Sequence, residues 1–467
     1  MKRGNCRGAK GAQEGGYVKD GPKETNPVSV RDAKRRGDVQ QEWCFSSKDH
    51  WRWAEPTVWT ERMLDALERG VKGGKWHSLI DKVYSPKNLR AGFERVKRNK
   101  GGAGVDHVTI EAFERQLGAN LEKLHGSLKA GTYRPQAIKR SWIPKPGTRE
   151  KRPLGIPSVR DRVVQTALRN VLEPIYEQGF APHSYGFRPQ CGCKDALRRV
   201  DALLKQGYSY VVDADIKRYF DSIPHNRLMA LVKTRIADGR VLALIEAFLD
   251  QEILDGLERW TPETGSPQGA VISPLLSNIY LDPLDHLMAV HGFEMVRYAD
   301  DFVVLCRDAG SAQAALALLE EWTVEAGLEL HPEKTHIVDH GSAEGFDFLG
   351  YHFKGGRRWP SKKSMKKIRA SIRAKTPRTY GHSLMHLIET LNPTLRGWFE
   401  YYKHSNKWTF SGLDGYVRMR LRSILRKRTK RKGRGRGIDH QRWPNAYFIA
   451  RGLYTLAQAH ERICQSS

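Results

Sequence analysis

The feature that most constrains this chain is a pair of adjacent carboxylates, Asp300 and Asp301, set between apolar runs at 295–296 and 302–305. Two apolar runs joined by a short polar turn predict a β-hairpin with the acids at its tip. Neighbouring carboxylates repel each other, and holding both beside an apolar strand calls for a cation that neutralises them. The pair therefore indicates a metal site, although a solvated Asp-Asp turn explains these two residues alone equally well.

A third carboxylate, Asp215, ends a second strand-like segment. Residues 208–212 (YSYVV) lead into 213–221 (DADIKRYFD). If the two strands are neighbours in one sheet, Asp215 faces Asp300 and Asp301. Such a cluster can hold two divalent ions about 4 Å apart, and this pair suits phosphoryl transfer because one ion activates the attacking oxygen while the other stabilises the leaving one.

Short motifs on either side of these carboxylates follow one another in order. They are GGAGVD at 101–106, IPKPG at 143–147, RPLGIP at 152–157, SYGFRP at 184–189, SPQG at 266–269, GL at 327–328 with PEKT at 332–335, and FLGY at 348–351. From about residue 88 to near the C-terminus, the chain resembles the group II intron-encoded reverse transcriptases that also act as maturases. A single short motif arises by chance, but an ordered series is hard to explain otherwise.

The resemblance implies a multidomain α/β (α+β) fold, the right hand of a polymerase with a helical maturase domain. We expect a basic, disordered tail over 1–58, fingers with an N-terminal extension over 59–205, a palm over 206–353, a thumb over 354–390 and the maturase RNA-binding region over 391–467. In the palm, a strand, a helix, a hairpin, a helix and a closing strand suggest a ferredoxin-like sheet.

Local patterns also predict individual helices and a hairpin. Apolar spacing indicates helices over 161–176, 272–281 and 312–326. The segment 141–157 alternates apolar and basic residues between prolines and predicts a hairpin in the fingers. The dense basic run Lys354–Lys375 predicts the opening of a helical thumb, with Pro360 at the start of the helix.

The resemblance also assigns roles to residues. It implies that Asp215, Asp300 and Asp301 are catalytic and hold two Mg²⁺ ions together with the backbone carbonyl of Ile216. The nucleotide-binding residues it implies are Lys145 and Arg152 on the phosphates, Phe220 as the gate that favours deoxynucleotides, and Gln268 near the sugar and primer end. From the residues alone, Lys145 and Arg152 could be plain surface charge and Phe220 a core side chain.

Composition favours nucleic acid as the partner. The 467 residues carry 79 Lys and Arg against 52 Asp and Glu, a formal charge of +27, so a polyanion is the expected ligand. The sequence contains no apolar run of about eighteen residues, the length that would indicate a membrane span. The predicted RNA-binding residues are Lys97, Arg98, Lys100, Lys362, Lys363, Lys366, Lys367, Arg396, Trp398, Tyr401, Lys427, Arg428, Lys430 and Arg431.

Aromatic residues at the two ends of the chain leave two interpretations open. Trp43, Trp51, Trp53 and Trp59 could stack on RNA bases, but we expect them to dock on the folded body. The aromatic residues of the block at 395–402 divide between RNA contacts and a helical core.

The resemblance implies an RNA-directed DNA polymerase that copies a group II intron RNA into DNA for retrohoming and, as a maturase, promotes its splicing. Its partners would be the intron RNA, a DNA target or primer and deoxynucleoside triphosphates, with a homodimer left open. No apolar segment follows the basic start of the chain, so we expect a bacterial cytoplasmic protein associated with nucleic acid. The short tail predicts no His-Asn-His endonuclease domain and hence no cleavage of the second DNA strand.

Two other functions remain open from sequence. One is an RNA-binding splicing chaperone without polymerase activity, against which the three intact aspartates argue. The other is a domesticated reverse transcriptase, for example in phage defence, against which the maturase-like block after Leu391 argues.

Overall fold

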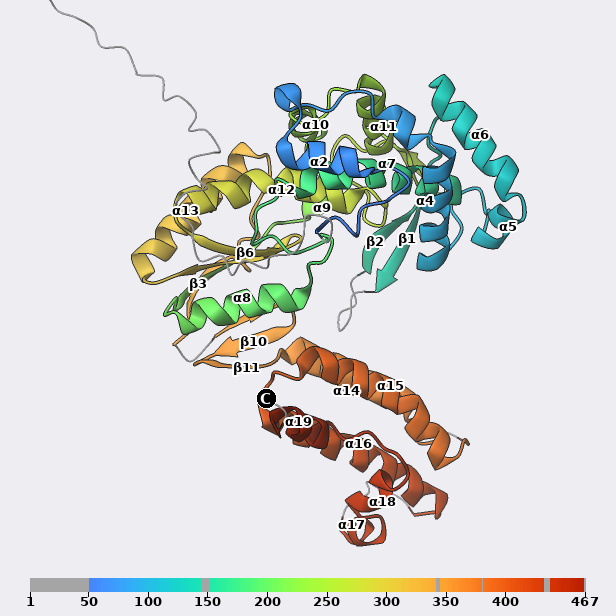
Figure 1. The fold of residues 1–467 in the computed structure, drawn as a ribbon. Coiled ribbons are helices and arrows are strands. Elements are labelled where there is room, and N and C mark those ends of the chain that lie inside the picture. The colour runs from blue at the N-terminus through green and yellow to red at the C-terminus, as the bar shows by residue number, and fades with distance from the viewer. Residues whose placement is uncertain (1–49, 145–150, 342–344, 380, 432–436, 466–467) are drawn as a thin grey trace, which may run out of the picture. The chain divides into compact units, whose positions relative to one another are not determined.

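The structure is a computed structural model that describes residues 50–144, 151–341, 345–379, 381–431 and 437–465. Its first part consists of helices with one β-hairpin at their edge (Figure 1). The elements are α2 (Glu61–Arg69), the short helix η2 (Lys72–Gly74), α3 (Ile80–Val83), α4 (Pro86–Asn99), α5 (Ile110–Arg115), α6 (Leu117–Ala130), β1 (Ile138–Pro144), β2 (Lys151–Ile156), α7 (Val159–Glu177) and α8 (Cys193–Lys205).

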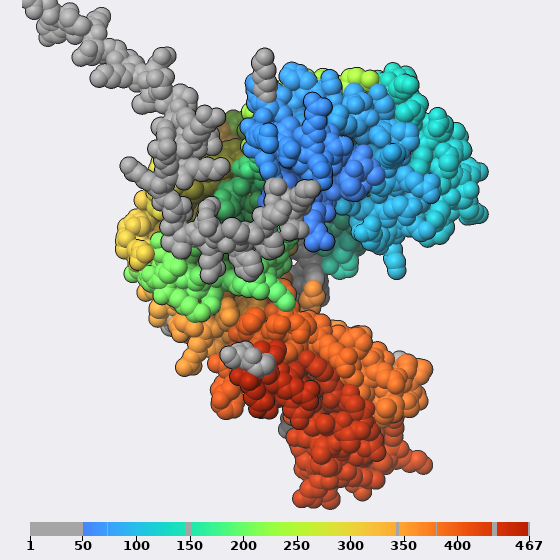
Figure 2. All heavy atoms as spheres, viewed as in Figure 1, coloured from blue at the N-terminus to red at the C-terminus, as the bar shows by residue number. Residues whose placement is uncertain are grey.

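Helix α7 is the centre of this part, and most of its residues are buried. Its packing against α4 is close because position 92 is glycine: a Cβ there would lie 2.9 Å from the carbonyl oxygen of Val163. The sequence prediction of a helix over 161–176 is confirmed, with α7 slightly longer at both ends. Helices α2 to α6 form the blue to cyan surface in Figure 2.

The tryptophans before α2 dock on this core, as predicted. Trp51 and Trp59 are buried, and the Trp59 Nε1 donates to the carbonyl oxygen of Asn170 at 2.9 Å. Trp53 is partly buried against the same core, whereas Trp43 lies outside the described residues. Because Trp51 is already a core residue, the packed body begins before residue 59, where the sequence prediction started it.

The middle of the chain builds an antiparallel sheet in the order β6-β7-β3-β8. This is the strand order of a ferredoxin-like fold, so the prediction for the palm is confirmed. The elements of this part are β3 (Tyr210–Asp215), α9 (Tyr219–Ser222), α10 (His225–Lys233), α11 (Gly239–Leu249), β4 (Ile253–Asp255), β5 (Glu258–Trp260), α12 (Ser273–Val290), β6 (Glu294–Tyr298), β7 (Asp301–Cys306), α13 (Ala309–Glu325) and β8 (His336–Asp339).

The palm sheet is covered on both faces. Alternate residues of β3 and β7, such as Val212 and Val304, join the core with α12 and α13, while Val211 and Val303 face α8. The helices predicted over 272–281 and 312–326 are confirmed as α12 and α13, and α12 continues through Pro283 to Val290. The predicted fingers hairpin is confirmed as β1 and β2, and β1 also pairs with β4.

The basic run Lys354–Lys375 becomes helical just after Pro360, where the predicted thumb helix starts, and its first residues form strands. Lys354 ends β10 (Tyr351–Lys354), which pairs with β9 (Phe346–Phe348) and β11 (Arg357–Pro360) in a second sheet. Gly355 and Gly356 both adopt left-handed φ, which closes the hairpin between β10 and β11. The helix begins only at α14 (Lys362–Lys375), where the side chain of Ser361 accepts a hydrogen bond as N-cap.

The last part of the chain is helical and has its own core. Asp414, buried in this core, accepts hydrogen bonds from the N–H groups of Leu456 and Ala457 and so fixes the start of the last helix. In the parts of the chain that the structure describes, no helix is both long enough and apolar enough to cross a membrane. The remaining helices are α15 (Leu384–Tyr402), α16 (Lys407–Arg428), α17 (Ile438–Arg442), α18 (Asn445–Ile449) and α19 (Leu456–Gln465).

Candidate active site

The sheet register brings the predicted carboxylates together. Asp215, the last residue of β3, is the direct cross-strand partner of Asp301, the first residue of β7. Asp300 precedes it in the turn that joins β6 to β7. The sequence prediction that these strands are neighbours is therefore confirmed, and Asp213 lies on the same face of β3 as Asp215.

The turn between β6 and β7 is held from beneath by a buried arginine. Ala299 has a left-handed φ of 62°, an unusual conformation for a residue with a Cβ. The fully buried Arg297 donates from Nη1 to the Ala299 carbonyl oxygen at 2.9 Å and to Asn278 Oδ1 at 3.0 Å, and from Nε to Asp285 at 2.8 Å. Asp285 and Asn278 both belong to α12, so that helix fixes the turn.

The SYGFRP loop (184–189) packs against the same turn. A Cβ at Gly186 would lie 2.0 Å from the Ala299 nitrogen, so only glycine fits there. The Gly186 carbonyl accepts from Asn278 Nδ2 at 2.8 Å, and the Tyr185 N–H donates to the Arg297 carbonyl at 2.8 Å. One buried network therefore joins the loop, the turn that carries Asp300 and α12.

The carboxylates carry more negative charge than their surroundings neutralise. Asp301 is exposed at the strand end, but its carboxyl group is largely surrounded by protein. This loss of solvation, together with the negative charges of Asp213, Asp300 and Asp215, raises the pKa of Asp301 to about 7. Burial, opposed by His336 and reinforced by Asp215, raises the pKa of Asp213 to about 6. Burial also raises the pKa of Asp300.

One cation already lies at this cluster. Lys334, in the PEKT segment, forms an ion pair with the Asp215 carboxylate. Across the described ranges, no three His, Cys, Asp or Glu side chains are gathered closely enough to hold a metal ion as they stand. The carboxylates would have to turn toward a metal ion, and Asp215 would have to exchange its lysine partner for it.

The predicted nucleotide-binding residues are only partly brought together. Phe220 and Gln268 line one cavity of about 180 Å³, which the three aspartates do not line. The Gly155 N–H of β2 donates to the Gln268 carbonyl at 2.7 Å, so the hairpin lies directly beside the SPQG turn. Arg152 is exposed on β2, and Lys145 lies outside the described residues.

The Ile216 carbonyl takes no part in the backbone hydrogen bonds that join this segment to residues 329–331. Ile216 forms an isolated bridge with Leu330. The bonds of this bridge use the Asp215 carbonyl, which accepts from His331, and the Lys217 N–H, which donates to Glu329. This geometry is compatible with the role that the resemblance implied for the Ile216 carbonyl.

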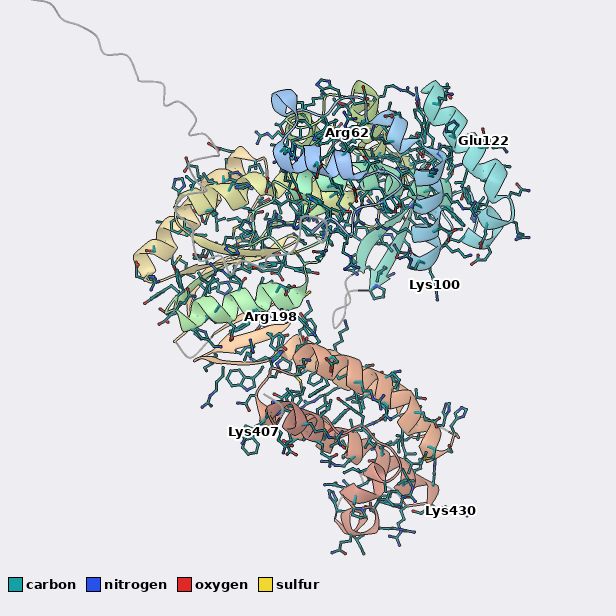
Figure 3. All side chains as sticks on the ribbon, viewed as in Figure 1. Arg62, Lys100, Glu122, Arg198, Lys407 and Lys430 are labelled. Carbon is teal, nitrogen blue, oxygen red and sulfur yellow. The ribbon has the colours of Figure 1, made fainter. Side chains whose placement is uncertain are left out.

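All the predicted RNA-binding cations are exposed, whereas the two predicted aromatic residues are packed against neighbouring side chains. Figure 3 shows Lys100 at the end of α4 and Lys430 beyond the end of α16. Trp398 packs against Tyr402, with ring centroids 4.9 Å apart, and the Tyr401 hydroxyl donates to the Leu349 carbonyl at 2.8 Å. The exposed cations are Lys97, Arg98, Lys100, Lys362, Lys363, Lys366, Lys367, Arg396, Lys427, Arg428, Lys430 and Arg431.

A ferredoxin-like sheet with carboxylates at the end of one central strand and at the adjoining hairpin turn is the palm of a polymerase. Residues 143–353 match the family model described as reverse transcriptase (RNA-dependent DNA polymerase), and residues 365–443 match the group II intron maturase-specific domain. The chain belongs to the group II intron-encoded reverse transcriptase and maturase family.

Curated relatives agree with this assignment. The group II intron-encoded protein LtrA of Lactococcus lactis subsp. cremoris is 38% identical over 229 residues, which are 47% of this chain and 37% of LtrA. Protein YkfC of Escherichia coli is 34% identical over 290 residues, 53% of this chain and 74% of YkfC. A 91 kDa protein in the cob intron of Schizosaccharomyces pombe is 41% identical over 198 residues, 42% of this chain and 24% of that protein.

Proposed function

We propose that this protein is an RNA-directed DNA polymerase that copies a group II intron RNA into DNA and, as a maturase, binds that RNA and promotes its splicing. The observation that carries the proposal is the register that sets Asp215 opposite Asp301 in a reverse transcriptase palm. The maturase part rests on the match over residues 365–443. The proposed substrates are a DNA primer and deoxynucleoside triphosphates.

Reverse transcriptases use divalent metal ions. We propose two Mg²⁺ ions, held by Asp215, Asp300, Asp301 and the Ile216 carbonyl. These donors are all oxygen atoms, which Mg²⁺ prefers. Burial, reinforced by neighbouring carboxylates, raises the pKa of both Asp300 and Asp301, and a bound cation would offset this cost of the charged form. When bound, the ions would activate the primer 3′-hydroxyl and stabilise the pyrophosphate that leaves.

The side chains around the aspartates would orient the nucleotide. Arg152, which is exposed on β2, would bind the triphosphate through two parallel hydrogen bonds, and Lys145 would add a second positive charge. Phe220 would occupy the space that a ribose 2′-hydroxyl needs and so favour deoxynucleotides. The contact between Gly155 and Gln268 supports a shared nucleotide site, because it joins the hairpin to the SPQG turn.

Lys334 competes with the metal ions for Asp215 in this account. Replacing Lys334 with methionine should lower, by several-fold, the Mg²⁺ concentration at which the metal site is half-occupied. The reason is that Asp215 then loses its ammonium partner. The thermal stability should change little, because the pair is partly exposed, with side-chain exposures of 59% and 37%. Titration with Mn²⁺ followed by its electron paramagnetic resonance signal measures the affinity. An unchanged or weaker affinity in Lys334→Met would contradict the competition.

The exposed cations in the last turn of α16 and just beyond it should bind RNA phosphates. The double variant Lys427→Ala, Arg431→Ala should weaken binding to intron RNA and reduce the slope of log affinity against log salt by about one for each lost phosphate contact. The matched control is Lys205→Ala, Lys233→Ala, which removes two exposed charges from α8 and α10. Filter binding at several salt concentrations provides the measurement. Equal slopes for both double variants would show that Lys427 and Arg431 do not contact the RNA.

A template-copying assay separates polymerase from chaperone. The proposal expects the protein to extend a DNA primer along an intron-derived RNA template with deoxynucleotides and Mg²⁺, and much less with ribonucleotides. Tight RNA binding without any extension would contradict the polymerase and leave the splicing chaperone as the function.

A further inference from the structure

Phe187, in the SYGFRP loop, is held in an unfavourable way. Its φ is 60°, in the left-handed region, and 41% of its side chain is exposed. A phenylalanine there has both backbone strain and an apolar ring in water, which a glycine or asparagine would avoid. Strain of this kind persists where the surrounding structure imposes it, and it gathers at functional sites.

The residues on either side of Phe187 impose this conformation. Gly186 is locked against Ala299 and accepts a hydrogen bond from Asn278. Arg188 donates from Nη1 to the carbonyl oxygens of Ala181 and Ser184, both at 2.6 Å, and from Nη2 to Glu177 at 2.7 Å. With its backbone fixed on both sides, Phe187 keeps its ring outside the core.

The ring lies against the proposed sugar gate. The centroids of Phe187 and Phe220 are 6.3 Å apart with their planes at 70°, a favourable edge-to-face contact. Phe220 also makes an edge contact at 5.4 Å with Tyr219. Tyr219 is immobilised, because it is buried and its hydroxyl donates to the Ser277 carbonyl at 2.8 Å. Phe220 is therefore in contact with two aromatic rings, each held by its own anchored segment.

Phe187 also borders a second cavity, of about 400 Å³, that Tyr298 of the catalytic hairpin lines as well. The same loop thus contacts the hairpin through Gly186 and the gate through Phe187.

We propose that Phe187 is a positioning residue that holds the Phe220 ring in the orientation that excludes a ribose 2′-hydroxyl. The inference rests on the proposed function, since it requires nucleotide addition with Phe220 as the gate. A gate ring discriminates only while it cannot turn aside, and Phe187 is the exposed contact that opposes such a turn.

The test is single-nucleotide addition to a primer, with the ratio of kcat/KM for a deoxynucleotide to that for the matching ribonucleotide as the readout. Phe187→Asn removes the ring but keeps a residue that tolerates left-handed φ, so the loop should fold normally. We expect this variant to lower the ratio about two- to tenfold, the effect of losing one aromatic pair. Phe187→Tyr should keep the ratio within about twofold, because it retains the ring.

A second pair of variants shows whether the effect passes through the gate. Phe220→Ala should lower the ratio by itself, and adding Phe187→Asn to it should lower the ratio no further. Equal loss of activity with both nucleotides in Phe187→Asn, with an unchanged ratio, would overturn the inference. A wild-type protein that adds no nucleotide would overturn the proposed function and the inference together, whereas an unchanged ratio in Phe220→Ala would overturn the gate and the inference but not the polymerase.

Discussion

Replacing Asp301 with asparagine is expected to reduce nucleotide addition on the order of a thousandfold or more, while the metal-free protein becomes as stable as the wild type or more stable. Asparagine keeps the shape of the side chain but removes one charged metal ligand. It also removes repulsion within the cluster, because Asp301 lies beside Asp213, Asp215 and Asp300. Single-turnover addition and melting temperature measure the two effects.

The gain in stability should depend on pH. The pKa of Asp301 is raised from 3.8 to about 7 in the folded protein, so the folded state binds a proton that the unfolded chain releases. The contribution of this carboxyl group to stability therefore decreases as pH rises from 3.8 to about 7 and stays low above that range. Without divalent ions, Asp301→Asn should melt higher than the wild type at pH 8 and lose that advantage as pH falls toward 4. Asp65→Asn, at an exposed position of α2, is the control. A lower melting temperature for Asp301→Asn at pH 8 would contradict the repulsion.

Replacing Arg297 with methionine should destabilise the fold by about 3–5 kcal/mol, because it leaves the Asp285 carboxylate buried without a partner. The Ala299 carbonyl also loses the donor that fixes the turn carrying Asp300. We expect nucleotide addition to fall on the order of a hundredfold at temperatures where the variant is still folded, since small displacements of reacting groups have such effects. Urea denaturation and single-turnover addition measure the two quantities.

A double variant separates the two roles of Arg297. Arg297→Met with Asp285→Leu removes both buried charges and should recover much of the lost stability. It should not recover activity, because the Ala299 carbonyl still has no donor. Arg62→Met, at an exposed position of α2, is the control for the loss of an arginine. Recovered activity in the double variant would show that Arg297 serves stability alone.

The features that could be predicted from the sequence are those that depend on local residue patterns. The hairpin at Asp300 and Asp301, the strand that ends at Asp215 and the central helix α7 each follow from spacing within a few residues. The ordered motifs then fix which segments share a domain. The matches over residues 143–353 and 365–443 confirm the family that these motifs indicated.

The features that sequence reasoning missed depend on contacts between distant segments. Arg297 reads as an ordinary basic residue in an apolar strand, and nothing local shows that Asp285 and Asn278 of α12 neutralise and bind it. A charged residue at a position facing the core was the available signal. The strand β11 was missed for a related reason. Its basic residues at 357–358 belong to the charged run that leads into the thumb helix, and its pairing with its hairpin partner β10, not its composition, decides its conformation.

The polymerase function of the Asp215, Asp300 and Asp301 cluster is tested most directly by addition of a single templated deoxynucleotide to a DNA primer annealed to RNA. The wild-type protein and Asp300→Asn are compared with Mg²⁺ present. Binding of the primer and template is measured in the same samples. We predict addition by the wild type only, with equal binding by both proteins. Binding without addition by the wild type, or addition by Asp300→Asn at the wild-type rate, would contradict this prediction.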